Sequence, residues 1–305
     1  MPLEYYECFG YPVESADLGH AISLKKCPFV GGECSKSFAN GITNGSCTLV
    51  NPRNGIPVPC CPKRLYGDDY RILEDVVQTA WGVDIPLVLQ DGKIPNSGSF
   101  VIPFGQKQGH EIRIAYKELR GASKFSIDWI LAKMNSKREL EGFVAVEVQT
   151  IDTTGNYRRQ FWELAEKHDS ETIREMEKPQ ASSSSFNFEN VNKRILPQLI
   201  TKGHVLRREN LCSKGLFFIC PTAVHKRVVQ RVGKLQDYPI QNGSITFLSY
   251  SIDQSSRSIS KSLRLDQTGT TTTDQLSLAF SSPKDLPPQG VYELAVRDAL
   301  HKRFS

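Results

Sequence analysis

Residues 143–150 read Phe-Val-Ala-Val-Glu-Val-Gln-Thr, and this stretch predicts a β-strand that carries an acid in an otherwise apolar run. Side chains along a strand point alternately to its two faces. The three valines therefore share one face, while Ala145, Glu147 and Gln149 share the other. Because burying a carboxylate is costly, an acid at this position suggests either a strand half open to water or a functional site.

A second stretch, residues 124–131, repeats this arrangement upstream. Its apolar side chains alternate onto one face: Phe125, Ile127, Trp129 and Leu131. Asp128 falls on the opposite face. The connection at 132–141 is polar and short enough for a hairpin, so we expect two antiparallel neighbouring strands. Asp128 and Glu147 are then expected within reach of one metal ion, although two half-exposed strands with acids facing water would give the same pattern.

The bulk composition is that of an ordinary globular protein. The chain has 305 residues, 39% of them hydrophobic and 23% charged, which allows one large domain or two modest ones. No run approaches the roughly 18 apolar residues of a membrane span, and the first residues lack the basic and apolar regions of a signal peptide. We therefore expect a cytoplasmic protein. The net charge of +5 is a mild lean towards polyanions such as nucleic acid.

Cysteines gather at the start of the chain. Six of the eight lie in the first 61 residues: Cys8, Cys27, Cys34, Cys47, Cys60 and Cys61. In a reducing compartment, such clustering favours metal ligands over disulfides. We expect residues 1–66 to form a loop-rich subdomain with little core, in which Zn or Fe held by Cys27, Cys34, Cys47 and Cys61 supplies a cross-link. The spacings are looser than in common zinc fingers, so free buried cysteines are the alternative, with Cys60 and Cys8 as reserve ligands.

The rest of the chain mixes helix and strand patterns. We expect helices at 66–81, 160–178, 190–208, 221–232 and 291–303, strands at 216–220 and 245–252, and a loop at 179–185. Residues 109–120, with Glu111 at their head, fit either a strand or a helix. In the helix at 190–208, the apolar residues Ile195, Leu199 and Val205 are expected to face inward. The basic residues are expected to face outward: Lys193, Arg194, Lys202, Arg207 and Arg208. This mixture predicts an α/β or α+β fold with a mixed sheet.

Residues 150–159 are expected to form a glycine-bearing turn that follows the central strand. Its Tyr157, Arg158 and Arg159 are candidates for binding phosphate, as are Lys193 and Arg194 on the following helix. A solvated loop and a solvated helix face would also explain these residues.

Several blocks of sequence, taken in order, are similar to the NotI-type Type II restriction endonucleases. They are Cys-Pro-Phe at 27–29, Cys34, Gly-Ser-Cys-Thr-Leu-Val at 45–50, Cys-Pro-Lys-Arg at 61–64, Phe-Ser-Ile-Asp-Trp-Ile-Leu-Ala at 125–132, Glu-Val-Gln-Thr-Ile-Asp-Thr-Thr-Gly-Asn-Tyr at 147–157, and Asn-Val-Asn-Lys-Arg at 190–194. The resemblance implies a PD-(D/E)xK nuclease domain at 67–305 beside the cysteine subdomain at 1–66. It also implies a homodimer, Mg²⁺-dependent cleavage of a palindromic and often GC-rich duplex, and a cognate DNA methyltransferase in a bacterial host.

The resemblance also implies roles for individual residues. Glu111, Asp128, Glu147 and Gln149 fall on the catalytic positions, and the carbonyl of Val148 joins the two central acids as a Mg²⁺ ligand. The four favoured cysteines fall on the ligands of the structural metal, iron in the relatives and chemically suited to zinc. Gln149 stands where the wider superfamily has lysine, a replacement that the NotI-type relatives share. Because a neutral amide is a poor base near pH 7, we expect Gln149 to orient the attacking water.

Two other functions remain open on the sequence alone. One is a metal-stabilised DNA-binding protein with a nuclease fold that does not cleave. The other is a repair or junction nuclease without sequence specificity. The three acids together favour a nuclease over a binder, and the pattern of products separates the two kinds of nuclease.

Overall fold

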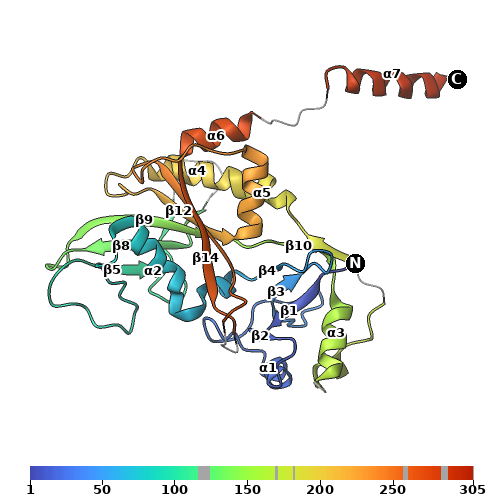
Figure 1. Cartoon of the computed structure of the whole chain (residues 1–305), viewed down its shortest axis with the longest axis horizontal. Helices are drawn as coiled ribbons and strands as arrows, with labels where there is room; N and C mark the ends of the chain where they lie inside the picture. Colours follow the sequence, from blue (N-terminus) through green and yellow to red (C-terminus); the bar gives the residue numbers. More distant parts are fainter. Residues whose placement is uncertain (116–123, 169–170, 181–182, 257–259, 283–287, 305) are drawn as a thin grey trace.

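The computed structural model describes residues 1–305 except 116–123, 169–170, 181–182, 257–259, 283–287 and 305. Within the described residues, a six-stranded mixed sheet forms the centre of the molecule (Figure 1). Its strands lie in the order β14 (Leu263–Thr272), β13 (Ser244–Ile252), β12 (Leu216–Pro221), β9 (Leu140–Val148), β8 (Trp129–Met134) and β5 (Phe100–Phe104). β12 pairs in parallel with β9 and β13, and the other neighbours are antiparallel. The predicted mixed sheet is confirmed.

Helices cover both faces of this sheet, as the alternation along β9 requires. Val144, Val146 and Val148 pack in one apolar cluster with α2 (Gly67–Trp81), which follows a short 3₁₀ turn, η1 (Pro62–Tyr66). Ala145 packs in the opposite cluster with three further helices, α4 (Leu196–Leu206), α5 (Thr222–Val232) and α6 (Thr273–Ser281). The fold therefore has three layers, and Glu147 lies where the sheet meets the layer that contains α4.

The first 66 residues contain more regular structure than the sequence predicts. They form an antiparallel sheet in the order β2 (Tyr11–Pro12), β1 (Glu4–Cys8), β3 (Ser46–Val50) and β4 (Pro57–Pro59), with α1 (Leu18–Leu24) beside it. Leu3, Tyr5 and Leu49 are buried in the same apolar cluster as Phe161 of α3 (Arg158–Lys167). β3 buries four consecutive residues, polar and apolar alike, so no two-residue hydrophobic period marks it in the sequence. The boundary at residue 66 stays a prediction.

Two segments expected to be irregular pair with each other instead. β10 (Thr153–Asn156) lies in the expected turn, β11 (Ser183–Phe186) begins in the expected loop, and the two pair antiparallel. Their small polar residues carry no hydrophobic alternation, so only the long-range pairing defines them. The helix expected at 160–178 is also shorter, because α3 ends at Lys167 and a 3₁₀ turn, η2 (Glu171–Glu175), follows.

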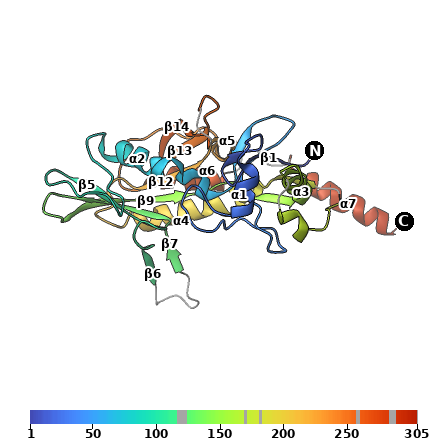
Figure 2. The same cartoon turned by 90° about the horizontal axis from the view of Figure 1, so that it is seen from below.

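The stretch 124–131 is not one continuous strand. β7 (Lys124–Ser126) pairs with β6 (Arg113–Ala115), and the chain then turns into β8. Ile127 consequently packs in the α4 cluster while Trp129 and Leu131 pack in the α2 cluster, so the expectation that they share a face was wrong. The strand alternative for residues 109–120 is confirmed at 113–115, and residues 116–123 lie outside the described part. β6 and β7 project from the body of the molecule (Figure 2).

Two features complete the fold. The helix expected at 190–208 begins with a π-helical turn, η3 (Val191–Ile195), that leads into α4. α7 (Val291–Phe304) stands apart from the body (Figure 1), and none of its described side chains is buried. Among the described residues, no helix combines the length and apolar character of a membrane span.

Candidate active site

Asp128 and Glu147 come together through the pairing of β8 with β9. Trp129 lies opposite Val146, so Asp128, one residue earlier, lies beside the end of β9. The backbone N–H of Val148 donates a hydrogen bond of 2.8 Å to Oδ2 of Asp128. The predicted antiparallel neighbours are present, and the backbone itself fixes the orientation of one acid relative to the strand that carries the other.

Asp128, Glu147 and Glu111 lie close enough for the charge of one acid to shift the pKa of another. Burial, and after it the charge of Asp128, raise the pKa of Glu147 to about 7 against the opposing effect of Lys202. Burial also raises the pKa of Asp128, the Val148 amide and Lys202 oppose that rise, and Glu111 adds to it. Glu111 is exposed, just before β6. All three predicted acids therefore influence one site, where their mutual repulsion favours binding of a cation.

Lys202 of α4 is the residue that the sequence analysis misplaced. Its Nζ donates to Oε1 of Glu147 at 2.5 Å, and only 17% of its side chain is exposed, so the expected outward orientation was wrong. A lysine stem can lie along apolar surface while the ammonium reaches a partner. The sequence carried the signal, because Lys202 is three residues after the buried Leu199 and four before the buried Leu206, on the inward face of the helix.

Gln149 lies one residue beyond the end of β9 and is partly buried. Its backbone N–H donates a hydrogen bond of 3.0 Å to the carbonyl of Ile219 in β12. Next to it, the hydroxyl of Thr150 donates to the carbonyl of Cys60 at 3.0 Å, which links the end of the acid-bearing strand to the cysteine-rich segment.

The candidate DNA contacts fall into two groups. Tyr157 is partly buried: its ring packs against Tyr5 and Phe38, and its hydroxyl shares a 3.2 Å hydrogen bond with Ser46. Arg158 lies over the Phe38 ring at 5.7 Å. These two side chains thus help to join α3 to the first 66 residues.

The other three candidates are exposed. Arg159 pairs with Glu163 at 2.8 Å, and Arg194 pairs with Asp152 at 3.6 Å. Lys193 is exposed on η3. Their charges are accessible to a polyanion, since surface ion pairs are weak and readily exchanged.

All eight cysteines lie in the described part of the chain, and none forms a disulfide. Across the described residues, no group of three or more His, Cys, Asp or Glu side chains is arranged as a ready metal site. The four favoured thiols are nevertheless close enough to interact. After burial, Cys61 is the largest influence that raises the pKa of Cys47, while Cys34 and Cys27 raise that of Cys61.

Hydrogen bonds to the backbone differ among the cysteine thiols. N–H groups of Lys36 and Gly45 donate to Cys34 and that of Lys63 donates to Cys61, and these bonds oppose the rise that burial causes in the thiol pKa values. The thiols of Cys60 and Cys8 instead donate to the carbonyls of Val58 and Asn44, at 3.2 and 3.6 Å. A bond that donates a proton requires the thiol form, whereas metal binding requires the thiolate. These hydrogen bonds favour the thiolate at Cys34 and Cys61 over Cys8, while the backbone N–H of Leu49 also opposes the rise in the pKa of Cys60.

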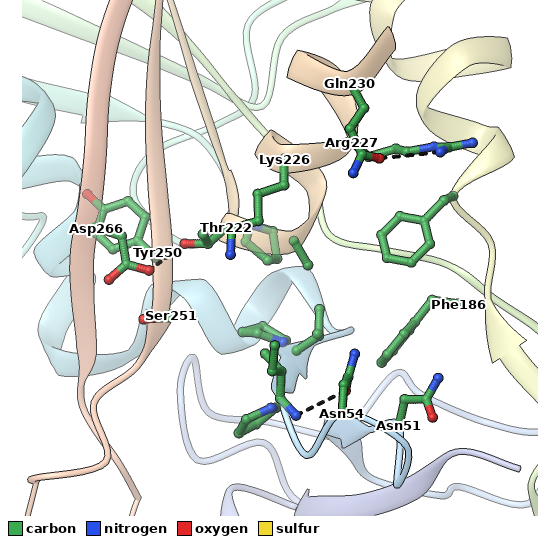
Figure 3. Close-up of a pocket in the computed structure, with 17 residues that line it drawn as sticks. Asn51, Asn54, Phe186, Thr222, Lys226, Arg227, Gln230, Tyr250, Ser251 and Asp266 are labelled. Atoms are coloured by element: carbon green, nitrogen blue, oxygen red, sulfur yellow. Dashed lines mark hydrogen bonds between the residues drawn. The ribbon is translucent and has the colours of Figure 1, made fainter. Parts of the chain in front are cut away.

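A groove of about 430 Å³ opens elsewhere on the molecule. Lys226, Arg227 and Gln230 of α5 line one side, and Asn51 and Asn54 of the β3–β4 loop line the other (Figure 3). The groove also includes aromatic side chains, Phe186 among them, and one acid, Asp266. None of the three predicted catalytic acids lines it, so it is a separate feature from the site at Asp128 and Glu147.

Comparison with known proteins agrees with the sequence blocks. Residues 20–263, most of the chain, match the family model described as Restriction endonuclease NotI. No curated protein matches the chain. The match spans both the cysteine-rich segment and the strands that carry the acids, so the resemblance seen in the sequence is confirmed and the chain belongs to the NotI restriction endonuclease family.

Proposed function

We propose that this chain is a Type II restriction endonuclease that hydrolyses duplex DNA at a specific site with Mg²⁺. The observation that carries the proposal is the pair of acids at the β8–β9 junction, Asp128 and Glu147, in a chain of this family. Two mutually repelling carboxylates, with Glu111 nearby, form a cation site of the hard oxygen type that Mg²⁺ prefers.

The residues of the chain would divide the work as follows. Asp128, Glu147 and the carbonyl of Val148 would hold the ion, and the Val148 N–H keeps Oδ2 of Asp128 in place. When bound, Mg²⁺ would lower the pKa of a water and polarise the scissile phosphate. Gln149, two residues beyond Glu147, would orient that water through its amide. Glu111, exposed at the edge of the site, is the candidate to accept a proton or to bind a second ion.

We also propose a homodimer acting on a palindrome, because two-fold symmetry in the protein matches two-fold symmetry in DNA. A GC-rich site, products with 5′-phosphate and 3′-hydroxyl ends, and a cognate methyltransferase in the bacterial cytoplasm belong to the same proposal. The groove at α5 fits recognition, since Arg, Asn and Gln are the side chains that read base edges.

The test is digestion of a mixed-sequence plasmid with Mg²⁺, followed by sequencing of the fragment ends. Discrete fragments with one shared end sequence are expected, and the sequence gives the recognition site and the position of the cut. A smear of fragments would instead support a repair or junction nuclease. Intact DNA that the protein still binds would support the non-catalytic DNA-binding alternative.

We further propose that Cys27, Cys34, Cys47 and Cys61 hold a structural Fe or Zn. The support is the electrostatic contact among these thiols and the N–H groups that donate to Cys34 and Cys61. Elemental analysis of protein purified without chelator should give about one metal per chain. Cys61→Ser should lose the metal while Cys60→Ser keeps it. A metal content below about half an ion per chain would overturn the assignment.

A further inference from the structure

We infer that Lys202 is a catalytic residue of this nuclease: its ammonium, held at Glu147, donates to the scissile phosphate when DNA is bound. The inference rests on the proposed function and assigns a role to a residue outside the predicted acid and cysteine sets. The first observation is the position of Lys202. It lies on α4, more than fifty residues after the strand whose acid it contacts.

Among the described side chains, Lys202 is the cation that contacts this acid pair. Its Nζ lies 2.5 Å from Oε1 of Glu147, whose strand also donates the Val148 N–H to Oδ2 of Asp128. One ammonium does not balance the two carboxylates of Asp128 and Glu147. The site therefore retains negative charge for a metal ion while it already holds one positively charged hydrogen-bond donor.

The packing of α4 fixes the backbone position of Lys202 beside Glu147. Leu199 and Leu206 are buried on either side of it along α4. The next residue, Gly203, lies so close to α6 that a Cβ there would come within 2.4 Å of Thr273 Oγ1. α4 is thus closely packed at this point. The backbone of Lys202 is pre-positioned beside the acids, and only its flexible stem needs to move.

The chemistry needs a donor of this kind. In hydrolysis, the water oxygen forms a bond to phosphorus and the bond from phosphorus to the 3′-oxygen breaks. The water proton passes to solvent, directly or through Glu111, and the 3′-oxygen receives a proton from solvent. Negative charge grows on the phosphate oxygens during this step. Lys202 keeps its protons throughout and donates to one of those oxygens, since an ammonium has three N–H donors and Glu147 takes one.

The amide at Gln149 explains why the site needs a cation from another element. A neutral amide at this position can orient a water but supplies no charge. The neighbouring helix supplies the missing ammonium to the same acid, so the site combines an amide from the end of β9 with a cation from α4.

The test compares Lys202→Gln with Lys137→Gln, an exposed lysine in the β8–β9 turn. Gln at 202 can still hydrogen-bond Glu147 but lacks the charge. At saturating Mg²⁺, the single-turnover cleavage rate of Lys202→Gln should fall by about 100-fold or more, the usual loss of one transition-state donor. DNA binding in Ca²⁺ and the thermal midpoint should change little. The Lys137 variant should cleave at the wild-type rate.

A double variant makes the test sharper. Lys202→Gln with Gln149→Lys should recover at least about tenfold of the lost rate, because it returns an amine to the same acid from the other side. Wild-type cleavage by Lys202→Gln at saturating Mg²⁺ would overturn the inference and leave Lys202 as a charge that the metal replaces. Intact plasmid with the wild-type protein would remove the proposed function, and the inference with it.

Discussion

Two ion pairs inside this molecule differ in how completely the hydrogen-bonding groups and charges of their members are paired. Glu7 and Arg64 form a bidentate ion pair, with Nε to Oε2 at 2.7 Å and Nη2 to Oε1 at 3.0 Å, and their side chains are 0% and 1% exposed. Glu147 and Lys202 share one contact, and the second acid, Asp128, crowds the first. In the first pair the charges balance and both carboxylate oxygens accept hydrogen bonds. In the second pair, negative charge remains unbalanced.

The surroundings of Arg64 explain why its pair is structural. The hydroxyl of Thr48 donates to Oε2 of Glu7 at 2.5 Å, the guanidinium also donates to the carbonyl of Lys261, and it lies 4.9 Å from the Phe29 ring centroid. A planar guanidinium suits such fixed multiple contacts, while a lysine is a mobile point charge. The comparison teaches that a buried ion pair indicates function where its hydrogen bonding is incomplete and structure where it is complete.

The largest expected effect is on the incomplete pair. Glu147→Gln should lower the DNA cleavage rate by on the order of 1000-fold or more, because it removes a charge from the proposed Mg²⁺ site. The same change should not lower the thermal midpoint of the metal-free protein, since it relieves repulsion with Asp128. Single-turnover cleavage and thermal unfolding measure the two outcomes. A large loss of stability would mean that Glu147 is structural, like Glu7.

Next in size is the complete pair. Arg64→Met should lower the free energy of unfolding by about 3–5 kcal/mol, because it leaves the Glu7 carboxylate buried without its counter-charge. The double change Glu7→Leu with Arg64→Met should cost less than the single change, since no charge is then stranded. Urea unfolding of the three proteins gives the comparison. A single variant as stable as wild type would show that the Glu7–Arg64 pair does not stabilise the fold.

The incomplete pair should also make stability depend on pH. The pKa of Glu147 is raised from its ordinary 4.5 to about 7, so the folded state binds this proton more tightly than the unfolded chain does. The contribution is present at low pH and is lost as pH rises through that range. Unfolding in EDTA should show stability falling with rising pH. Glu147→Gln should flatten this part of the profile, and an unchanged slope in that variant would assign the effect to another group.

The smallest effect is expected at an exposed pair of the same chemistry. Arg297 and Glu293 on α7 lie 2.6 Å apart, but their side chains are 72% and 68% exposed. Solvent screens such pairs, so Arg297→Ala should leave the thermal midpoint essentially unchanged. A clear shift in that midpoint would show that α7 contributes to the cooperative unit despite standing apart from the sheet.

The sequence predicted what local periodicity can encode. The alternation at 143–150 and the helical spacing at 66–81 both match elements of the structure, and the pairing of β8 with β9 followed from a short polar connection. The pairing of β10 with β11 was missed because strands built of Thr, Gly, Asn and Ser show no alternation of apolar and polar residues. The bend at Asp128, which sends Ile127 to the other face from Trp129, also depends on tertiary packing.

The site was predicted in the same uneven way. Asp128 and Glu147 could be named because charged residues within apolar strands stand out, whereas Glu111 was named from the family resemblance. Lys202 was assigned to solvent because basic residues on helices usually face water, although its spacing from Leu199 and Leu206 placed it inward. A buried acid needs a counter-charge, and searching the helices for that partner would have identified it.

The parallel pairing of β9 with β12 also orders events in time during synthesis. β9 ends at Val148, but β12 begins only at Leu216, after α4 has been made. A chain leaving the ribosome therefore presents both acids before their covering helix and central sheet partner exist. A chain whose synthesis has not reached Leu216 lacks this centre, so we expect the nuclease activity proposed here to appear only after translation has passed β12.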